Sequence, residues 1–307
     1  MNYELRQDET LGGGIQRIIC HQIERAIKAS NAQQNGKGSP VHATRRHLKR
    51  ARSALRLAAE EVKRDVWRQE DRRLQRVGKL ISEVRDAEVR LQTVRQLREF
   101  AKGKKRSFRE TEELLAFELD SFLAAFSEWP QEAKQRLTQS LDQIRAWPLN
   151  DLSCKQLRKC VQRTYKRGRN ALKDAIRKPN IKNLHTFRKR AKELWCQLRI
   201  LRPLAPIVFE ELNDELKAIG QYLGQVHDLA FVADRLTSFG SAKRGDRLLQ
   251  ALIDSREKDL EATSTALGER FYAEKPRQFA RRIARYFSTW EVAKDQILAR
   301  PTESANS

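Results

Sequence analysis

The sequence predicts an all-α fold of two four-helix bundles related by pseudo-twofold symmetry. Apolar residues recur at helical spacing along most of the 307 residues, and no segment shows the sustained alternation of a β-strand. Only 13 Gly and 8 Pro interrupt the chain, which favours long helices. A residue pattern of the first half also returns in the second half, which indicates an internal duplication.

The apolar periodicity sets the order of the expected helices. They fall at residues 11–30, 41–64, 67–101, 107–128, 131–146, 152–177, 182–202, 206–238, 246–268 and 277–299. The polar segment 31–40 contains Gly and Pro and predicts a loop between the first two helices.

The middle of the chain carries the predicted boundary between the bundles. Residues 147–151 combine Trp, Pro, Leu, Asn and Asp, and Asp151 or Ser153 is expected to cap the helix that follows. We therefore expect a first bundle at 1–150, a second bundle at 151–300 and a disordered tail at 301–307.

Two ordered matches between the halves carry the inference of duplication. When His42 is aligned with His185, the cations Arg45 and Lys49 align with Arg188 and Lys192. Further along, segment 81–86 aligns with segment 223–228, and both segments end in Asp. The order of the two matches is the same in both halves, so chance is a poor explanation.

A cationic row runs beside the apolar stripe of the helix expected at 41–64. Positions 41, 44, 48, 51, 55, 58 and 62 form the stripe that should face the core. One position further round the helix lie the residues of the row, with Arg46 alongside: His42, Arg45, Lys49, Arg52 and Arg56. A solvated helix face normally mixes both signs of charge, whereas this row has no acidic residue.

The helix expected at 182–202 repeats this layout. Its row consists of His185, Arg188, Lys192 and Arg199, with Lys189 alongside, and Trp195 stands where the first row has Arg52. The preceding helix adds further cations, and its Gly168 is expected to allow close approach of another backbone or of a ligand.

The net charge of +22 is concentrated in three segments, 41–56, 152–178 and 182–202. Clustered cations repel one another, so an anionic partner is the natural compensation. Arg and Lys bind phosphate oxygens through charge-assisted hydrogen bonds. Because few aromatic residues accompany the rows, a phosphate polymer without bases is favoured over single-stranded nucleic acid.

At this point the sequence resembles a known family. Residues 41–56 and 184–192 resemble the two copies of the signature helix of the CHAD family, the conserved histidine α-helical domain. Residues 165–172 are similar to the basic helix that precedes the second copy, and the segments ending at Asp86 and Asp228 resemble two Asp-containing segments of the family. The resemblance extends over about residues 10–300.

The resemblance implies that the chain binds inorganic polyphosphate in a basic channel between two bundles and associates with polyphosphate granules and their proteins. By matching position it implies the following binding residues: His42, Arg45, Arg46, Lys49, Arg52, Arg56, Tyr165, Lys166, Arg169, His185, Arg188, Lys189, Lys192 and Arg199.

Catalysis is not expected from the sequence. No P-loop, HExxH motif or nucleophile elbow occurs, and neither a cofactor nor a metal site is expected. Asp86 and Asp228 are interpreted as buried partners that orient Arg or His side chains. If His42 and His185 must be protonated to bind, affinity should rise below about pH 6.5.

Two other functional classes stay open, namely a sequence-nonspecific nucleic-acid-binding protein and a phosphate-polymer hydrolase or its scaffold. No apolar stretch is long enough to cross a membrane, and the four cysteines form no CxxC pair. The sequence therefore predicts a cytoplasmic protein with reduced thiols.

Overall fold

The computed structural model describes residues 3–32, 39–100, 106–150, 152–238 and 244–298, and these residues form helices and connections with no strand. In chain order the elements are α1 (Leu11–Ser30), α2 (Pro40–Leu55), α3 (Arg64–Leu80), α4 (Ser82–Phe100), α5 (Arg106–Ala125), α6 (Trp129–Arg145), α7 (Cys154–Arg177), α8 (Ile181–Ile200), the short 3₁₀-helix η1 (Arg202–Leu204), α9 (Pro206–Ser238), α10 (Arg244–Phe271) and α11 (Pro276–Leu298). The predicted all-α class is confirmed.

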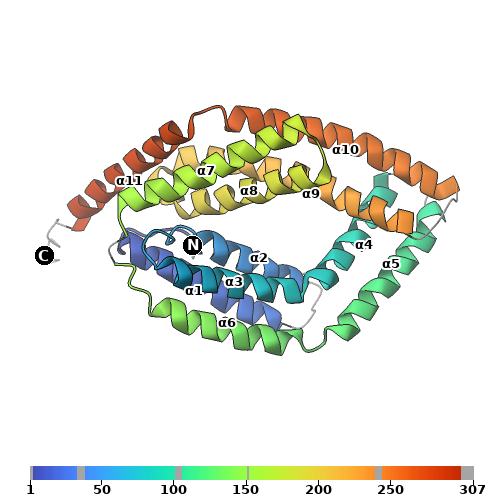
Figure 1. Ribbon diagram of the computed structural model, residues 1–307, viewed down its shortest axis with the longest axis horizontal. Helices are drawn as coiled ribbons and strands as arrows, with labels where there is room; N and C mark the ends of the chain where they lie inside the picture. Colours follow the sequence, from blue (N-terminus) through green and yellow to red (C-terminus); the bar gives the residue numbers. More distant parts are fainter. Residues whose placement is uncertain (1–2, 33–38, 101–105, 151, 239–243, 299–307) are drawn as a thin grey trace, which may run out of the picture.

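The helices pack in two groups that follow the halves of the sequence. In the first half, α1 packs against α2 and α6, and α4 packs against α5. In the second half, α7 packs against α8 and α11, and α9 packs against α8 and α10. Figure 1 shows the first group along the lower side and the second along the upper side, with α4, α5 and the adjoining parts of α9 and α10 at one end.

The two groups meet through helices that the predicted repeat relates to each other, because α2 packs against α8 and α4 packs against α9. One continuous core contains buried residues of both groups, such as Leu48 and Leu194. The duplication, and the division into bundles at 1–150 and 151–300, stay predictions. The expected tail at 301–307 and most of the expected loop at 31–40 lie outside the described residues.

Local sequence explains where the helices near the site begin. Ser39 caps α2 by accepting the backbone N–H of His42, and Pro40 occupies the first helical position, where no N–H is needed. Ser153 caps α7 in a reciprocal capping box with Gln156. Of the two caps considered from the sequence, Ser153 is therefore confirmed, whereas Asp151 lies outside the described residues.

Two of the expected helices differ in the structure, because one is divided in two and the other ends early. The single helix predicted at 67–101 is wrong, since α3 ends at Leu80 and α4 begins at Ser82. Between them Ile81 is fully buried in a small cluster with Val41. The helix predicted at 41–64 ends at Leu55, and turns lead from there to α3. Periodicity continues through both breaks because the connecting residues are also packed against the core.

The apolar stripes that flank the cationic rows are confirmed as core. The α2 stripe is buried throughout, from Val41 to Leu55, and the α8 stripe is buried from Leu184 to Leu198. Gly168 is buried on α7, where an added Cβ would lie 2.2 Å from the hydroxyl of Tyr272. The close neighbour that Gly168 permits is thus an aromatic side chain of the segment that follows α10.

Candidate anion-binding site

The contact between α2 and α8 fixes the positions of both cationic rows. The Ser53 hydroxyl of α2 donates to the carbonyl oxygen of Glu193 in α8 at 2.9 Å, and Gln197 donates back to the Ser53 carbonyl oxygen at 3.5 Å. All three residues are buried. Both apolar stripes face the core, and the cationic rows lie beside them. The contact between α2 and α8 therefore places the two rows near each other.

Five cations from three helices form what we call the cationic centre: Arg45 and Lys49 of α2, Arg85 of α4, and Arg188 and Lys192 of α8. The pKa of Lys49 is lowered to about 7, mainly by burial and then by the nearby charges of Arg45, Lys192, Arg188 and Arg85 in that order. The predicted rows of the two halves therefore come within electrostatic range of each other.

Lys49 is partly desolvated although it lies at the surface. Its side chain is exposed, and yet desolvation by surrounding protein is the main cause of its lowered pKa. Lys192 is half-buried, and burial together with Arg188 lowers its pKa to about 8. The stem of Lys192 passes Gly220 of α9, where an added Cβ would lie 3.3 Å from it.

Each half of the chain has an aspartate whose charge acts on one arginine of the cationic centre. Arg45 donates to the carbonyl oxygen of Gly78 at 2.9 Å, one of the four carbonyls that the end of α3 leaves without a helical partner. The charge of Asp86 favours the protonated form of Arg45, and Asp228 does the same for Arg188. The orienting role expected for the two aspartates stays a prediction.

The histidines near the centre favour the neutral state. Burial and the neighbouring cations, led by Arg85, lower the pKa of His42 to about 4. The pKa of His185 is also lowered by burial, and its ring lies 4.4 Å from that of His227, centroid to centroid. With its pKa of about 4, His42 is neutral near pH 6.5 in the free protein. The conditional expectation that affinity rises below about pH 6.5 stays a prediction. A neutral imidazole still has one N–H to donate.

Arg52 and Arg56, expected in the anion site, are paired with carboxylates. Both Asp71 oxygens accept from Arg52, at 2.8 and 2.9 Å, and one of them lies 3.5 Å from Arg56. Arg56 also forms an ion pair with Glu193 at 3.2 Å. These two arginines therefore carry less free positive charge than the sequence suggested. Lys189 lies near them, and both lower its pKa after the larger effects of burial and Arg190.

The row ends at Arg199, which packs against aromatic rings. Its guanidinium carbon lies 5.1 Å from the ring centroid of Trp195 and 5.7 Å from that of Tyr3. Arg50 of α2 lies over the same Tyr3 ring at 5.4 Å. Arg46 is exposed on α2.

The three residues proposed from α7 differ in their surroundings. Tyr165 is 0% exposed, stacks on Phe279 at 4.1 Å and donates to the carbonyl oxygen of Phe271 at 3.1 Å. It is a core residue, which corrects the expectation of a binding role. Lys166 is exposed and Arg169 is half-buried. Neither is among the main charges that shift the pKa values of Lys49 and Lys192.

Sequence reasoning missed Arg85 and Asp71. Arg85 is oriented by an ion pair with Glu88 at 3.0 Å and lowers the pKa values of residues on both α2 and α8. Its position next to Asp86, in a segment that recurs in the second half, was an available signal. Asp71 lies on α3 outside any recognisable pattern, so the sequence offered no reason to pair it with Arg52.

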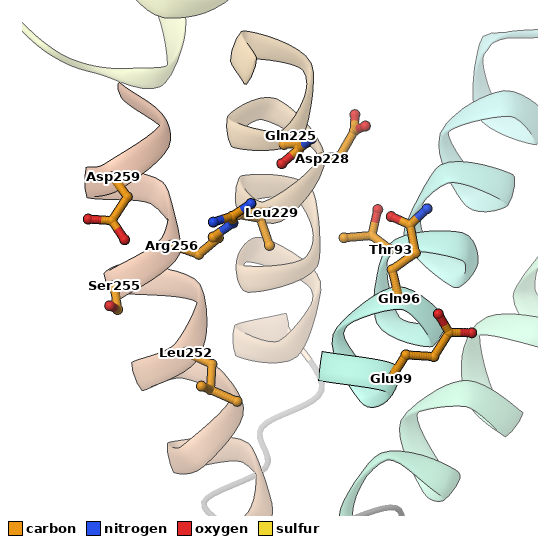
Figure 2. A pocket seen from close by; sticks show the side chains of 10 residues that line it. All are labelled: Thr93, Gln96, Glu99, Gln225, Asp228, Leu229, Leu252, Ser255, Arg256 and Asp259. Carbon is orange, nitrogen blue, oxygen red and sulfur yellow. The ribbon is translucent and has the colours of Figure 1, made fainter. Parts of the chain in front are cut away.

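A cavity of about 510 Å³ lies between α4, α9 and α10. Figure 2 shows Asp228 extending from α9 toward α4, with Arg256 and Asp259 on α10. Among the described residues that line the cavity are three carboxylates, those of Glu99, Asp228 and Asp259, and one cation, Arg256. This mostly acidic lining disfavours an anionic polymer, so we do not include the cavity in the anion site. The cavity adjoins the cationic centre through Asp228.

Among the described residues, no group of three or more His, Cys, Asp or Glu side chains is arranged to hold a metal ion. The cysteines are free, with Cys20, Cys160 and Cys196 buried and Cys154 half-buried. No helix in the described part of the chain is long and apolar enough to cross a membrane.

Comparison with protein families agrees with this arrangement. The family model for the CHAD domain matches residues 17–237, from α1 into α9, and so includes both cationic rows and both aspartates. A search of the curated proteins finds no match. Because the match covers well over half of the sequence, the chain belongs to the CHAD family.

Proposed function

We propose that the chain binds inorganic polyphosphate, without catalysis, in a basic channel between its two halves. The observation that carries the proposal is the pKa of Lys49, which is lowered to about 7 by burial and by cations of α2, α4 and α8. Cations held this close destabilise one another in the free protein, and an anion among them relieves that repulsion. Membership of the CHAD family supports the same ligand class.

A linear polyphosphate matches the chemistry of the cationic centre. Its charges repeat along a flexible chain without bases, and Arg45 and Arg188 can each contact phosphate oxygens bidentately. Lys49 and Lys192 act as point charges between them. Aromatic side chains, which would stack on nucleic-acid bases, are absent from the five residues of the centre, so it offers phosphate contacts and no base readout.

The absence of catalysis is part of the proposal. Asp86 and Asp228 favour the charged states of Arg45 and Arg188, which is a positioning task. Phosphoryl transfer normally relies on carboxylates that hold Mg²⁺ beside the phosphates. Release of phosphate from polyphosphate by the purified protein with Mg²⁺ would contradict this part of the proposal. A cytoplasmic location and association with polyphosphate granules follow from the same proposal.

The test is equilibrium binding of long-chain polyphosphate at several salt concentrations. Log affinity should fall linearly with log salt as counterions are released. The double variant Lys49→Ala/Lys192→Ala should bind at least tenfold more weakly, with a slope shallower by roughly 1 to 2. The control Lys134→Ala/Lys258→Ala removes the same charge from exposed positions on α6 and α10 and should behave like the wild type.

Competition separates polyphosphate from nucleic acid as the ligand. Duplex or single-stranded DNA at equal phosphate concentration and moderate salt should leave most of the polyphosphate bound. Displacement by DNA under these conditions would instead support a sequence-nonspecific nucleic-acid-binding protein. Equal weakening in the two double variants would show that net charge, and not the cationic centre, governs binding.

A further inference from the structure

The N-terminal segment crosses from α8 to α2. The Leu5 N–H donates to the carbonyl oxygen of Ile200 in α8 at 3.0 Å, and the Tyr3 hydroxyl donates to the carbonyl oxygen of Arg50 in α2 at 3.2 Å. Glu4 adds an ion pair with Arg202 at 3.0 Å. The segment thereby ties the end of α8 to the middle of α2, and it precedes the region that matches the family model.

Two arginines, Arg50 of α2 and Arg199 of α8, share the ring of Tyr3. Arg50 lies 5.4 Å and Arg199 5.7 Å from the ring centroid, and Arg199 also lies 5.1 Å from the centroid of Trp195. Tyr3 is only 6% exposed, whereas both arginines are half-buried. We call this set, Trp195, Arg199, Tyr3 and Arg50, the arginine–aromatic stack.

The stack holds two cations together without neutralising them. Among the described residues, neither Arg50 nor Arg199 forms an ion pair with a carboxylate, in contrast to Arg52 and Arg56. Arg199 is close enough to Arg50 to lower its pKa. Packing on an aromatic face leaves the N–H edges of a guanidinium available, and it reduces the side-chain entropy that is lost when those edges bind an anion.

The stack lies next to the cationic centre. Burial raises the pKa of the Cys196 thiol, whereas Arg50, Arg199, the Tyr3 hydroxyl and Lys192 lower it, so all four groups lie near this thiol. Lys192, a member of the centre, precedes Cys196 by one helical turn on α8. Arg199 follows Lys192 by seven residues, roughly 10 Å further along the same face of α8.

We propose that Arg50 and Arg199 form a second phosphate subsite that continues the anion site past Lys192, and that Tyr3 is the positioning residue that holds both guanidiniums in place. The inference rests on the proposed function, because its ligand is the same phosphate polymer. It assigns a role to Tyr3, which lies outside the family match, and to Arg50, which is not among the binding residues inferred from the resemblance.

The subsite is tested with Arg50→Ala/Arg199→Ala in the full chain, using long-chain polyphosphate as the probe. Loss of two phosphate contacts should make the slope of log affinity against log salt shallower by about 1.4. An unchanged slope and affinity in this variant, while the wild type binds polyphosphate, would overturn the subsite. If the wild type itself does not bind polyphosphate, the proposed function fails first, so the two failures are distinguishable.

The role of Tyr3 is tested by a conservative pair of substitutions. Tyr3→Phe keeps the ring between the arginines and deletes only the hydroxyl, so its affinity and salt slope should match the wild type. Tyr3→Leu keeps an apolar side chain in the buried position and removes the ring, and its affinity should fall about fivefold because two arginines must be ordered on binding. In the Arg50→Ala/Arg199→Ala background, Tyr3→Leu should cause no further loss.

Three results would overturn the role of Tyr3: equal affinities for the Phe and Leu variants, an additive loss in the combined variant, or tighter binding by Tyr3→Leu. The last would mean that the ring blocks the arginines from the polymer. Circular dichroism and thermal unfolding identify a variant that fails to fold. In that case the Arg50→Ala/Arg199→Ala variant, which leaves Tyr3 in place, still decides whether the subsite exists.

Discussion

Arg56 of α2 and Glu193 of α8 form an ion pair across the two halves, with 3.2 Å between Arg56 Nε and Glu193 Oε1. The Glu193 side chain is 4% exposed, and its other oxygen accepts from Arg190 at 2.9 Å. Its backbone carbonyl oxygen accepts a hydrogen bond from the Ser53 hydroxyl. Glu193 therefore holds the α2–α8 contact through both backbone and side chain, while it neutralises part of the cationic surface.

We expect Glu193→Ala to lower the free energy of unfolding by about 3 kcal/mol, because it leaves Arg56 and Arg190 without their shared carboxylate. Chemical denaturation measures the change. The matched control is Glu113→Ala, which breaks an exposed pair with Arg109 on α5 and should cost far less. Equal losses in the two variants would show that the buried pair does not stabilise the contact.

Removal of the Asp71 carboxylate should lower the stability of the fold and raise the affinity for polyphosphate. Asp71 holds Arg52 through two hydrogen bonds and also lies near Arg56, so Asp71→Asn frees positive charge beside the rows. We expect the polyphosphate salt slope to become steeper by about 1, with higher affinity at low salt. The free energy of unfolding should fall by about 1 kcal/mol. Weaker binding by this variant would mean that the Asp71 carboxylate positions the arginines for the ligand.

Polyphosphate binding should be coupled to proton uptake. In the free protein, the pKa of Lys49 is about 7 and that of Lys192 about 8, so Lys49 is largely uncharged at pH 8. A bound polyanion favours the charged ammonium, and affinity should therefore fall as the pH rises from about 6 to about 9. Calorimetry at pH 8 in buffers of different ionisation enthalpy measures the uptake.

Lys49→Arg supplies the control, since a guanidinium stays charged throughout this range. Its proton uptake should be smaller than that of the wild type, and its affinity should depend less on pH. The free protein should also respond to pH. The folded-state pKa of Lys49 is lowered from 10.5, so the unfolded chain binds more protons and this residue adds stability as the pH rises from about 7 toward 10. Identical proton uptake on polyphosphate binding by Lys49→Arg and by the wild type would rule out Lys49 as the group that takes up the proton.

Gly168 and Gly78 offer a matched test of helix packing. In Gly168→Ala the new Cβ would lie 2.2 Å from the Tyr272 hydroxyl, and we expect a loss of about 2 kcal/mol in the free energy of unfolding. In Gly78→Ala the nearest atom is Leu48 Cδ1 at 3.9 Å, so the gain in helix propensity should leave stability unchanged or raise it by up to about 1 kcal/mol. Thermal unfolding of both variants decides the matter, and tolerance of Ala at position 168 would contradict the described α7–Tyr272 packing.

Local sequence was sufficient for most of the helical framework. The apolar stripes of α2 and α8 and the cationic rows beside them follow from spacing along one helix, and the structure buries those stripes as expected. Cap chemistry narrowed the start of α7 to Asp151 or Ser153, and the structure shows Ser153 as the cap. The break at Ile81 was not predictable in the same way, because Ile81 continues the apolar pattern and its burial beside Val41 depends on a distant helix.

The sequence by itself determined that cations line up on two related helices, because helical spacing is a property of neighbouring residues. Only the tertiary structure decided which of those cations keep free charge, since their partners come from other elements. Asp71 and Glu193 pair with Arg52 and Arg56, Tyr3 packs against Arg199, and Tyr165 lies in the core. Electrostatic interaction depends on distance in space, which the order of residues along the chain does not specify.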